Sequence, residues 1–395
     1  MPQADSILNL YGFEIEDISG PDPLVLKVKS ALMAECPHCL SNELRLKDTF
    51  YRWVRHESFG LRSVYLHVKT HKYRCNRCGR YFNSRFPGIM PYRRSTEAFR
   101  KEIFYKHHDG ISQKILSRRL EIGHATVERY FQDFLKLKAT RSINDPAPRV
   151  VGIDEHFFSR KDGYATTLCD LGNHKVYDVV LGRTEAALKR YLDEVPDKDK
   201  TRVVVMDLSE TYRSVVKKYF PRAKIVADRF HVIRLVNHHF LKTWQLIDSE
   251  GRKNRGLLSL MRRHEEKLAP EQRLRLYHYF GGFPALQVIW EFKQKLVRLL
   301  LIKQRTQKSV RPLIPKFLYY VRSLKDSPFE SLSTLGRTLE SWGEEIARMW
   351  RFTKSNGITE GFHNKMELIS RRAYGFRNFE NYRLRVRVLC GLVRH

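Results

Sequence analysis

The chain has 395 residues, 42% of them hydrophobic, so it has room for two or three domains with sizeable cores. Lysine and arginine number 73 against 43 aspartate and glutamate, and the formal net charge of +30 indicates a polyanionic partner such as nucleic acid. The 12% aromatic content excludes general disorder, and no apolar run approaches the roughly 18–20 residues that a membrane span requires. The first residues lack a signal-peptide pattern, so we expect a reducing, cytoplasmic location without a disulfide framework.

Four of the six cysteines form two Cys-x-x-Cys pairs separated by 35 residues. Each pair supplies two thiolates to one point, and four such ligands satisfy tetrahedral zinc. We therefore expect one structural Zn²⁺ in a zinc ribbon over residues 1–92, held by Cys36, Cys39, Cys75 and Cys78. Val64, Leu66 and Val68 alternate with polar residues between the pairs, which predicts a ribbon strand. The ribbon has two possible roles that the sequence does not separate: stabilising its own domain, and also contacting DNA phosphates.

Residues 93–141 carry helical patterns interrupted by short turns. Phe99, Ile103 and His107 share one helix, Ser112 is a plausible N-cap of a second, and a third is expected over 125–137. A Gly-containing turn before the last helix is typical of a helix-turn-helix, which places that helix in the DNA major groove. The residues expected to contact DNA there are Thr126, Arg129, Gln132 and Lys136. A plain three-helix scaffold is the alternative.

A Pro-rich break at 144–148 marks the expected change of domain. We assign residues 142–231, which include this break, to the first part of the next domain. The element order there reads strand, strand, strand, helix, strand, helix, strand. That order is the order of the ribonuclease H-like fold, an α/β fold with mixed strand pairing. We expect a multidomain α/β protein with a catalytic domain of this kind.

Two aspartates stand at the ends of strands that are neighbours in that topology, Asp154 after the first strand and Asp207 after the fourth. Carboxylates forced together repel unless a cation lies between them, and hard oxygen ligands select Mg²⁺ or Mn²⁺. Two such ions can hold the attacking and leaving oxygens of a phosphoryl transfer. The third acid is expected from a helix over 355–373, on which Glu360, Asn364, Glu367 and Arg371 form a polar stripe.

At these residues the chain resembles DDE transposases of the ISL3 family of bacterial insertion sequences. The similarity runs from the cysteine pairs to the C-terminus, and its most specific stretches are VVGIDEHFF at 150–158, 203–235 and 355–389. The resemblance implies Asp154, Asp207 and Glu360 as the metal-binding triad, with two Mg²⁺ or Mn²⁺ ions. It also implies a helical insertion over 232–350, a second catalytic part over 351–395, and a cytoplasmic, nucleoid-associated bacterial protein. The expected partner is double-stranded DNA, both the element's terminal inverted repeats and the target, and pairing two ends makes a homodimer the minimal assembly.

Asp228 and His231 resemble an Asp-x-x-His motif of insertion-bearing transposases, and Asp228 is the rival of Asp207 for the second catalytic position. The segment 351–395 holds ten Lys/Arg against three Glu, and Arg371, Arg372 and Arg377 are expected to track DNA phosphates. The other reading of the chain is a DNA-binding regulator that keeps the fold without the chemistry. The tryptophans of the insertion and the two remaining cysteines are expected to pack in cores.

Overall fold

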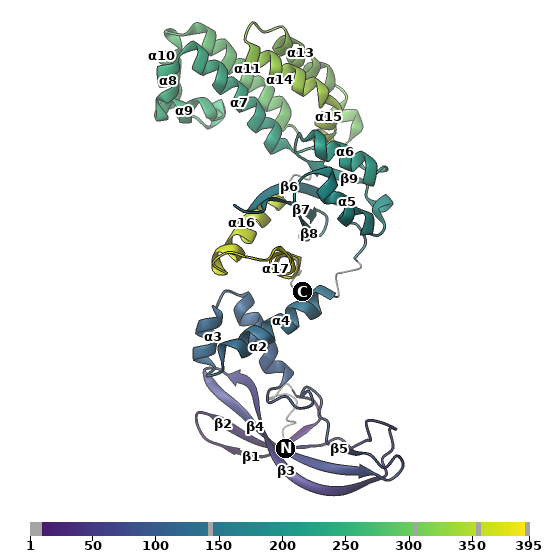
Figure 1. Cartoon of the computed structure of the whole chain (residues 1–395). Helices are drawn as coiled ribbons and strands as arrows, with labels where there is room; N and C mark the ends of the chain where they lie inside the picture. Colours follow the sequence, from purple (N-terminus) through teal and green to yellow (C-terminus); the bar gives the residue numbers. More distant parts are fainter. Residues whose placement is uncertain (1–9, 141–144, 304–305, 353–356, 392–395) are drawn as a thin grey trace. The chain divides into compact units, whose positions relative to one another are not determined.

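The computed structural model describes residues 10–140, 145–303, 306–352 and 357–391. Residue 144 of the expected linker and residues 355–356 of the expected Glu360 helix therefore lie outside the described ranges. The chain divides into two compact units, Met1–Arg141 and Ser142–His395. Both sheets are mixed, and helices dominate the second unit (Figure 1).

The first unit is built on a five-stranded sheet followed by three helices. The strands are β1 Phe13–Ser19, β2 Leu24–Ser30, β3 Leu44–Phe59, β4 Arg62–Cys75 and β5 Tyr81–Asn83, in the order β1-β2-β4-β3, with β5 also paired to β4. The predicted alternation on β4 buries Val64, Leu66 and Val68, which pack with Leu26 and Val28 of β2. The sheet is thus larger than the ribbon hairpin expected from the sequence, because β2 adds to β4 in parallel.

The three helices of this unit are α2 Glu97–His108, α3 Gln113–Arg119 and α4 His124–Thr140. The hydroxyl of Ser112 accepts a hydrogen bond from the Ile115 backbone N–H, so Ser112 is the N-cap of α3 as the sequence predicted. Phe99, Ile103, Leu116 and Val127 form the small core that joins the helices.

The second unit contains a sheet of five strands in the order β10-β9-β6-β7-β8. These are β6 Val150–Ser159, β7 Gly163–Asp170, β8 Lys175–Leu181, β9 Val203–Met206 and β10 Lys224–Ala227. β6, β7 and β8 pair antiparallel, whereas β9 is parallel to both β6 and β10. The pairing of β6 with β9 confirms that Asp154 and Asp207 belong to neighbouring strands, but β6 continues to Ser159, so Asp154 lies within its strand and does not end it as the sequence predicted.

Helices on both sides of this sheet complete the core of the second unit. α5 Glu185–Glu194 and α6 Glu210–Tyr219 lie on one side, and α16 Gly357–Arg372 and α17 Phe379–Gly391 lie on the other (Figure 1). Cys169 and Cys390 are buried in this core, as packing residues are.

The segment between β10 and α16 is helical throughout its described residues, apart from a 3₁₀ turn at Glu265–Lys267 and short connections. Its helices are α7 Arg229–Ile247, α8 Ser249–Lys253, α9 Arg255–Arg262, α10 Pro270–Gly281, α11 Pro284–Leu301, α12 Gln307–Val310, α13 Leu313–Lys325, α14 Glu330–Ser341 and α15 Gly343–Arg351. Trp244 and Trp290 are fully buried in a separate core at the far end of α7, while Trp342 and Trp350 join the core of the sheet.

A buried ion pair ties this helical segment to the sheet layer. Arg213 Nη2 of α6 lies 2.9 Å from Glu345 Oε2 of α15, and the guanidinium stacks 3.6 Å from the ring centroid of Trp342. Both charged side chains are mostly buried, so removing one would leave the other unpaired in the interior.

Candidate functional site

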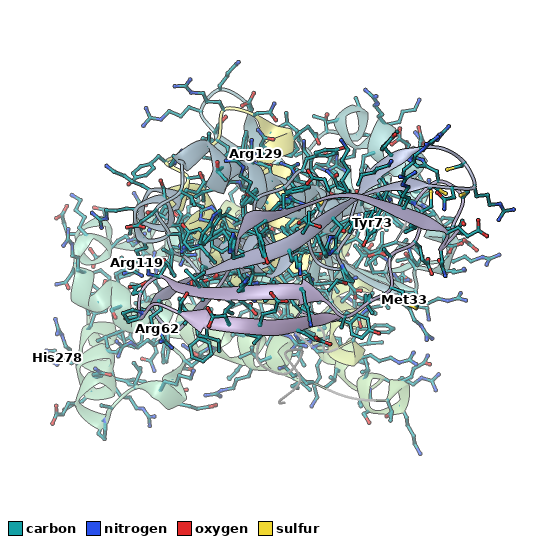
Figure 2. All side chains as sticks on the ribbon, turned by 90° about the horizontal axis from the view of Figure 1, so that it is seen from below. Met33, Arg62, Tyr73, Arg119, Arg129 and His278 are labelled. Atoms are coloured by element: carbon teal, nitrogen blue, oxygen red, sulfur yellow. The ribbon has the colours of Figure 1, made fainter. Side chains whose placement is uncertain are left out.

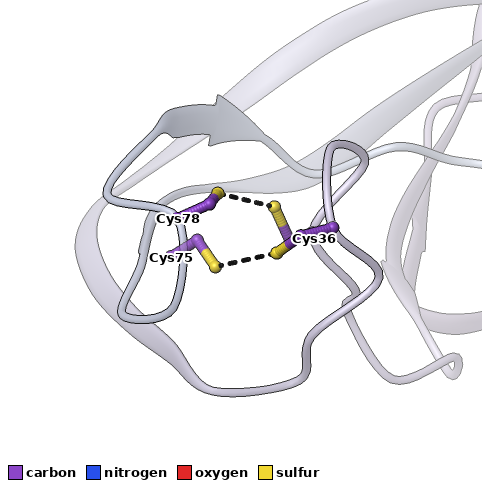
Figure 3. A group of neighbouring side chains, drawn as sticks. Cys36, Cys75 and Cys78 are labelled. Atoms are coloured by element: carbon purple, nitrogen blue, oxygen red, sulfur yellow. Dashed lines mark hydrogen bonds between the residues drawn. The ribbon is translucent and has the colours of Figure 1, made fainter.

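The four cysteines meet at one end of the N-terminal sheet (Figure 3). Cys36 Sγ lies 3.6 Å from Cys78 Sγ, and Cys39 Sγ lies 3.5 Å from Cys75 Sγ. Disulfide sulfurs are separated by about 2.05 Å, whereas four sulfurs around a zinc ion with Zn–S bonds of about 2.3 Å are separated by nearly 4 Å. The spacing and the ligand chemistry therefore fit tetrahedral zinc.

Both Cys-x-x-Cys pairs are held by the same turn. The backbone N–H of Leu40 donates to the Cys36 carbonyl, and that of Gly79 donates to the Cys75 carbonyl, each at 2.9 Å. Both residues after the second cysteine adopt a left-handed backbone, with φ of 57° at Leu40 and 73° at Gly79. Backbone N–H groups of Cys78 and Arg77 that donate to the Cys75 sulfur lower the pKa of that thiol to about 7. The second turn thus favours a thiolate at Cys75, the form in which cysteine binds zinc.

The second cluster forms in the other unit, where β9 ends beside the middle of β6. Asp154 of β6, Asp207 directly after β9 and His231 of α7 each offer a ligand atom, and these atoms lie within 4.8 Å of one another. His231 Nδ1 is 2.9 Å from Asp207 Oδ2, and its Nε2 is 3.6 Å from Asp228 Oδ2. Asp228, which directly follows β10, thus approaches the other ring nitrogen of the same histidine.

The electrostatics of this cluster favour a bound cation. Burial, followed by the negative charge of Asp207, raises the pKa of Asp154 to about 7. Burial would lower the pKa of His231, but its hydrogen bond to Asp207 and the negative charges of Asp207, Asp228 and Asp154 together outweigh burial, and the pKa is raised. Asp207 Oδ1 is buried and has no hydrogen-bond partner. A carboxylate oxygen with no donor, next to a second buried carboxylate, fits a hard divalent cation.

Glu360 is not part of this cluster. It is exposed in the first turn of α16, next to the fully buried Thr359. His363, one helical turn later, does reach the acids, because its Nδ1 lies 3.8 Å from Asp154 Oδ2. The helix therefore brings its Glu360 side toward Asp154 without placing the carboxylate among the other ligands.

Two histidines beside the acids were missed by the sequence analysis. The hydroxyl of Thr167 lies 3.1 Å from His363 Nε2 and 2.9 Å from His156 Nδ1, and Tyr382 lies 2.9 Å from His156 Nε2. Burial lowers the pKa of His156 to about 3 and that of His363 to about 4, so both rings are neutral at pH 7. The signal was present in the spacing, since His156 follows Asp154 by two residues on one strand and His363 follows Glu360 by three on one helix.

Two adjoining hollows open from the acids along α7. The first, of about 530 Å³, is lined by Asp207 and His231, and the second, of about 880 Å³, is lined by Lys242, Arg252 and Arg262. Arg234 and His238 line both. Basic side chains thus run along one helix from the acidic cluster into the helical segment.

The residues expected to contact DNA lie on exposed or half-buried surfaces. Arg129 and Lys136 are exposed on α4, with Arg119 on the preceding helix (Figure 2), whereas Thr126 and Gln132 are half-buried. Arg129 Nη2 lies 3.4 Å from the Thr126 hydroxyl, and Gln132 donates to Glu128. The basic residues near the end of the chain, Arg371, Arg372 and Arg377, are all exposed.

Comparison with known proteins identifies the class as transposases. A family model for ISL3-type DDE transposases matches residues 151–386, and the chain therefore belongs to this family. The transposase for insertion sequence element IS1001 of Bordetella parapertussis is 23% identical over 97% of this chain and 96% of its own length. An ATP-dependent protease of Lactococcus lactis subsp. lactis is 29% identical over 28% of this chain and 32% of that protein, which is too short to bear on the acidic site.

Membership of the family implies DNA as the partner and a metal-dependent transposition activity in general. Within the described residues, no helix is both long and apolar enough to cross a membrane.

Proposed function

We propose that this transposase binds the terminal inverted repeats of its insertion sequence, cleaves DNA strands at the element ends and joins the freed ends to target DNA. The observation that carries this proposal is the pair of carboxylates on neighbouring strands, Asp154 buried and Asp207 half-buried with one unpartnered oxygen, beside a basic hollow. The strand order β10-β9-β6-β7-β8 supports a ribonuclease H-like catalytic domain, interrupted by a helical insertion at 232–350 and completed by 351–395.

Asp154, Asp207 and Glu360 are the proposed ligands of two Mg²⁺ or Mn²⁺ ions. Divalent cations held there would supply Lewis-acid stabilisation of the phosphate oxygens and a reactive water or 3′-hydroxyl. Glu360 is proposed as the third ligand because His363, one turn away on α16, already approaches Asp154. Asp207 is preferred to Asp228 as the second acid because Asp207 shares the cluster with Asp154, whereas Asp228 approaches Nε2 of His231.

The chain's other residues position these groups and the DNA. His231 donates to Asp207 and fixes the direction of its second oxygen. Arg234, His238 and Lys242 recur every four residues on α7 and would hold the backbone phosphates of a strand that leaves the acids. No side chain is needed as a covalent nucleophile.

The N-terminal unit is the proposed end-recognition part. One Zn²⁺ at the four cysteines would hold the ribbon (1–92), and α3 and α4 would act as a helix-turn-helix (93–141) with Thr126, Arg129, Gln132 and Lys136 toward the bases. Arg371, Arg372 and Arg377 are proposed phosphate contacts. Two element ends must be held together during joining, so the proposed active form is a homodimer.

The deciding experiment incubates the full-length protein with labelled element-end DNA, a target plasmid and Mg²⁺ or Mn²⁺. A joined product that disappears with EDTA supports the proposal. Cleavage without joining would reduce the activity to that of a nuclease. Specific end binding without cleavage under either metal would mean that the chain is a regulator that retains the transposase fold.

A further inference from the structure

A chain of side-chain hydrogen bonds leads from α17 through β6 and β7 to α16. The Tyr382 hydroxyl of α17 lies 2.9 Å from His156 Nε2, and His156 Nδ1 lies 2.9 Å from the Thr167 hydroxyl. The Thr167 hydroxyl lies 3.1 Å from His363 Nε2 of α16. The other nitrogen of that ring, His363 Nδ1, lies 3.8 Å from Asp154 Oδ2. The chain therefore ends at one of the proposed metal ligands.

The strand register places these groups on one face of the sheet. Asp154 and His156 are two residues apart on β6, so they project from the same face, and Thr167 of β7 is directly opposite Asp154. The hydrogen bonds show that α16 and α17 cover this face. Thr167 is completely buried and Tyr382 is nearly so, and their hydroxyls therefore depend on partners within the protein.

The buried tyrosine sets the direction of these hydrogen bonds. Within the described residues, the hydrogen bond that the Tyr382 hydroxyl makes is the one to His156 Nε2, so its proton is donated there. Burial lowers the pKa of His156 and of His363, and each neutral ring carries one proton at pH 7. The His156 proton is then on Nδ1, which donates to the Thr167 oxygen. The Thr167 hydroxyl donates in turn to His363 Nε2, which leaves the His363 proton on Nδ1.

The position of this last proton decides how His363 acts on Asp154. An N–H directed at a carboxylate attracts it, whereas the lone pair of an unprotonated nitrogen would repel it. Asp154 Oδ1 already accepts the backbone N–H of Glu155 at 2.8 Å, so a second N–H near Oδ2 restrains the carboxylate at both oxygens. Each carboxylate oxygen has two lone pairs, which leaves Oδ2 able to bind a cation as well.

We propose that Tyr382, acting through His156 and Thr167, is a positioning residue that keeps the His363 proton on Nδ1 and so holds Asp154 in the orientation that binds a divalent cation. The inference rests on the proposed function, because it takes Asp154 as a metal ligand, and it adds residues outside the proposed triad. Partners of this kind behind a metal ligand typically account for about 10–100-fold in metal affinity.

The first test measures the affinity of the full-length protein for Mn²⁺, followed through the EPR signal of the free ion. Asp207→Asn removes a proposed ligand and so identifies the Mn²⁺ that the acids hold. Tyr382→Phe and Thr167→Val each remove one hydroxyl of the chain and should weaken that binding about tenfold. Thr167→Ser keeps the hydroxyl and should restore most of the affinity.

Tyr212→Phe is the matched control. The Tyr212 hydroxyl of α6 lies 2.9 Å from the Thr166 hydroxyl, so it makes the same kind of hydrogen bond to the same strand. Thr166 and Thr167 are successive residues of β7 and project from opposite faces of the sheet. Tyr212→Phe should therefore leave the Mn²⁺ affinity close to that of the parent. Equal losses in Tyr212→Phe and Tyr382→Phe would show that loosened packing is the cause and would overturn the inference.

The position of the His363 proton gives a second readout that needs no metal. Protonated and unprotonated ring nitrogens have well-separated NMR chemical shifts in protein with ¹⁵N-labelled histidine, and His363→Asn identifies the His363 signals by their loss. The parent should carry this proton on Nδ1, and Tyr382→Phe and Thr167→Val should give a mixture of the two ring forms. If these variants do not fold, the ring nitrogens of the parent decide the result.

The outcomes separate this inference from the proposed function. A parent with the His363 proton on Nε2 overturns the positioning chain, and so does unchanged Mn²⁺ affinity in folded Tyr382→Phe and Thr167→Val. In either case a joined DNA product leaves the transposase function intact. A parent that binds no Mn²⁺ at the acids and joins no DNA overturns the proposed function and the inference with it.

Discussion

The two groups of metal-ligand residues in this protein are organised in opposite ways. The four cysteines come from two tight turns of matching geometry, and their sulfurs are already at the spacing of a closed tetrahedral site. Asp154 lies within β6 and Asp207 follows β9, Asp207 lines a hollow of about 530 Å³, and the carboxylate of Glu360 is not among their neighbours. Closed sites serve structure, whereas chemistry requires open coordination positions, so we interpret the cysteines as a structural centre and the acids as the proposed reactive one.

The largest effect is expected from the acids. Asp154→Asn, Asp207→Asn and Glu360→Gln should each lower strand cleavage and joining by about 10³-fold or more, because each removes a ligand charge from the site that stabilises the reacting phosphate. Zinc content and end binding should remain those of the parent. Gel assays on labelled element ends measure strand cleavage and joining.

Asp228→Asn is the matched control for those variants, since it neutralises an acid that contacts His231 but does not share the ligand cluster of Asp154 and Asp207. Its activity loss should be much smaller. An inactive Asp228→Asn beside an active Asp207→Asn would reverse the assignment of the second acid while leaving the enzyme class unchanged.

Cys36→Ser should produce the complementary phenotype in the other unit. Structural zinc contributes folding energy directly, so the variant should lose zinc, unfold the cysteine turns and weaken end binding, measured by metal analysis and DNA titration. Cys169→Ala, a buried cysteine outside the cluster, should keep its zinc. A Cys36→Ser protein that retains stoichiometric zinc would show that the four thiols are not the site.

Cation binding at the acidic cluster should depend on pH around 7. The pKa of Asp154 is raised to about 7, so its carboxyl is protonated below that pH and can bind a cation only above it. Without metal, this shift makes the folded unit more stable toward acid and less stable as pH rises through 7. Stabilisation of the folded unit by Mg²⁺ should instead increase as pH rises, because Mg²⁺ affinity should fall about tenfold per pH unit below 7.

Thermal unfolding with and without Mg²⁺ at several pH values measures this dependence. Asp154→Asn should remove it. An Mg²⁺-induced shift in Tm of equal size at pH 6 and pH 8 in the parent would contradict the burial-driven shift of this group.

The smallest expected effects distinguish the two cysteine turns. Leu40 adopts the left-handed backbone that Gly79 adopts without strain. Leu40→Gly should therefore stabilise the N-terminal unit by about 0.5–1 kcal/mol, and Gly79→Ala should cost about 1 kcal/mol although no atom obstructs the added methyl group.

Chemical unfolding followed through Trp53, the exposed tryptophan of that unit, measures both changes. Leu61→Gly is the control, because Leu61 is fully exposed and has no positive φ, so glycine there brings no relief of strain. Equal effects of Leu40→Gly and Leu61→Gly would show that the backbone of the first turn is not strained.

Local signals in the sequence predicted much of this architecture. Ser112 caps α3, and the order of strands and helices predicted for residues 142–231 is the order observed. Asp154 and Asp207 meet because each follows one residue of the paired Ile153 and Met206 on parallel neighbouring strands, an adjacency that the element order alone indicates. The four tryptophans from 244 onward pack in cores, as expected for large apolar rings.

Features that depend on long-range packing were not predictable in the same way. Strand β2 pairs with β4 across some forty residues, and the alternation of Leu24, Leu26 and Val28 marks a strand without naming its partner. The distance of Glu360 from the acids depends on how α16 packs against β6 and β7, which no local pattern encodes. The contact between Thr167 and His363 likewise joins residues 196 positions apart.

Helix α7 belongs to both halves of the second unit at once. It contributes His231 to the acidic cluster near its first residue, and Trp244 to the separate core near its last. Its nineteen residues make the helix about 28 Å long. A tilt of about 5° pivoting on Trp244 would swing His231 by about 2 Å, enough to break its contact with Asp207. The packing of α7 therefore couples the helical segment to the acids, so a tilt of α7 caused by proposed DNA contacts at Lys242 or Arg252 would move His231 relative to Asp207.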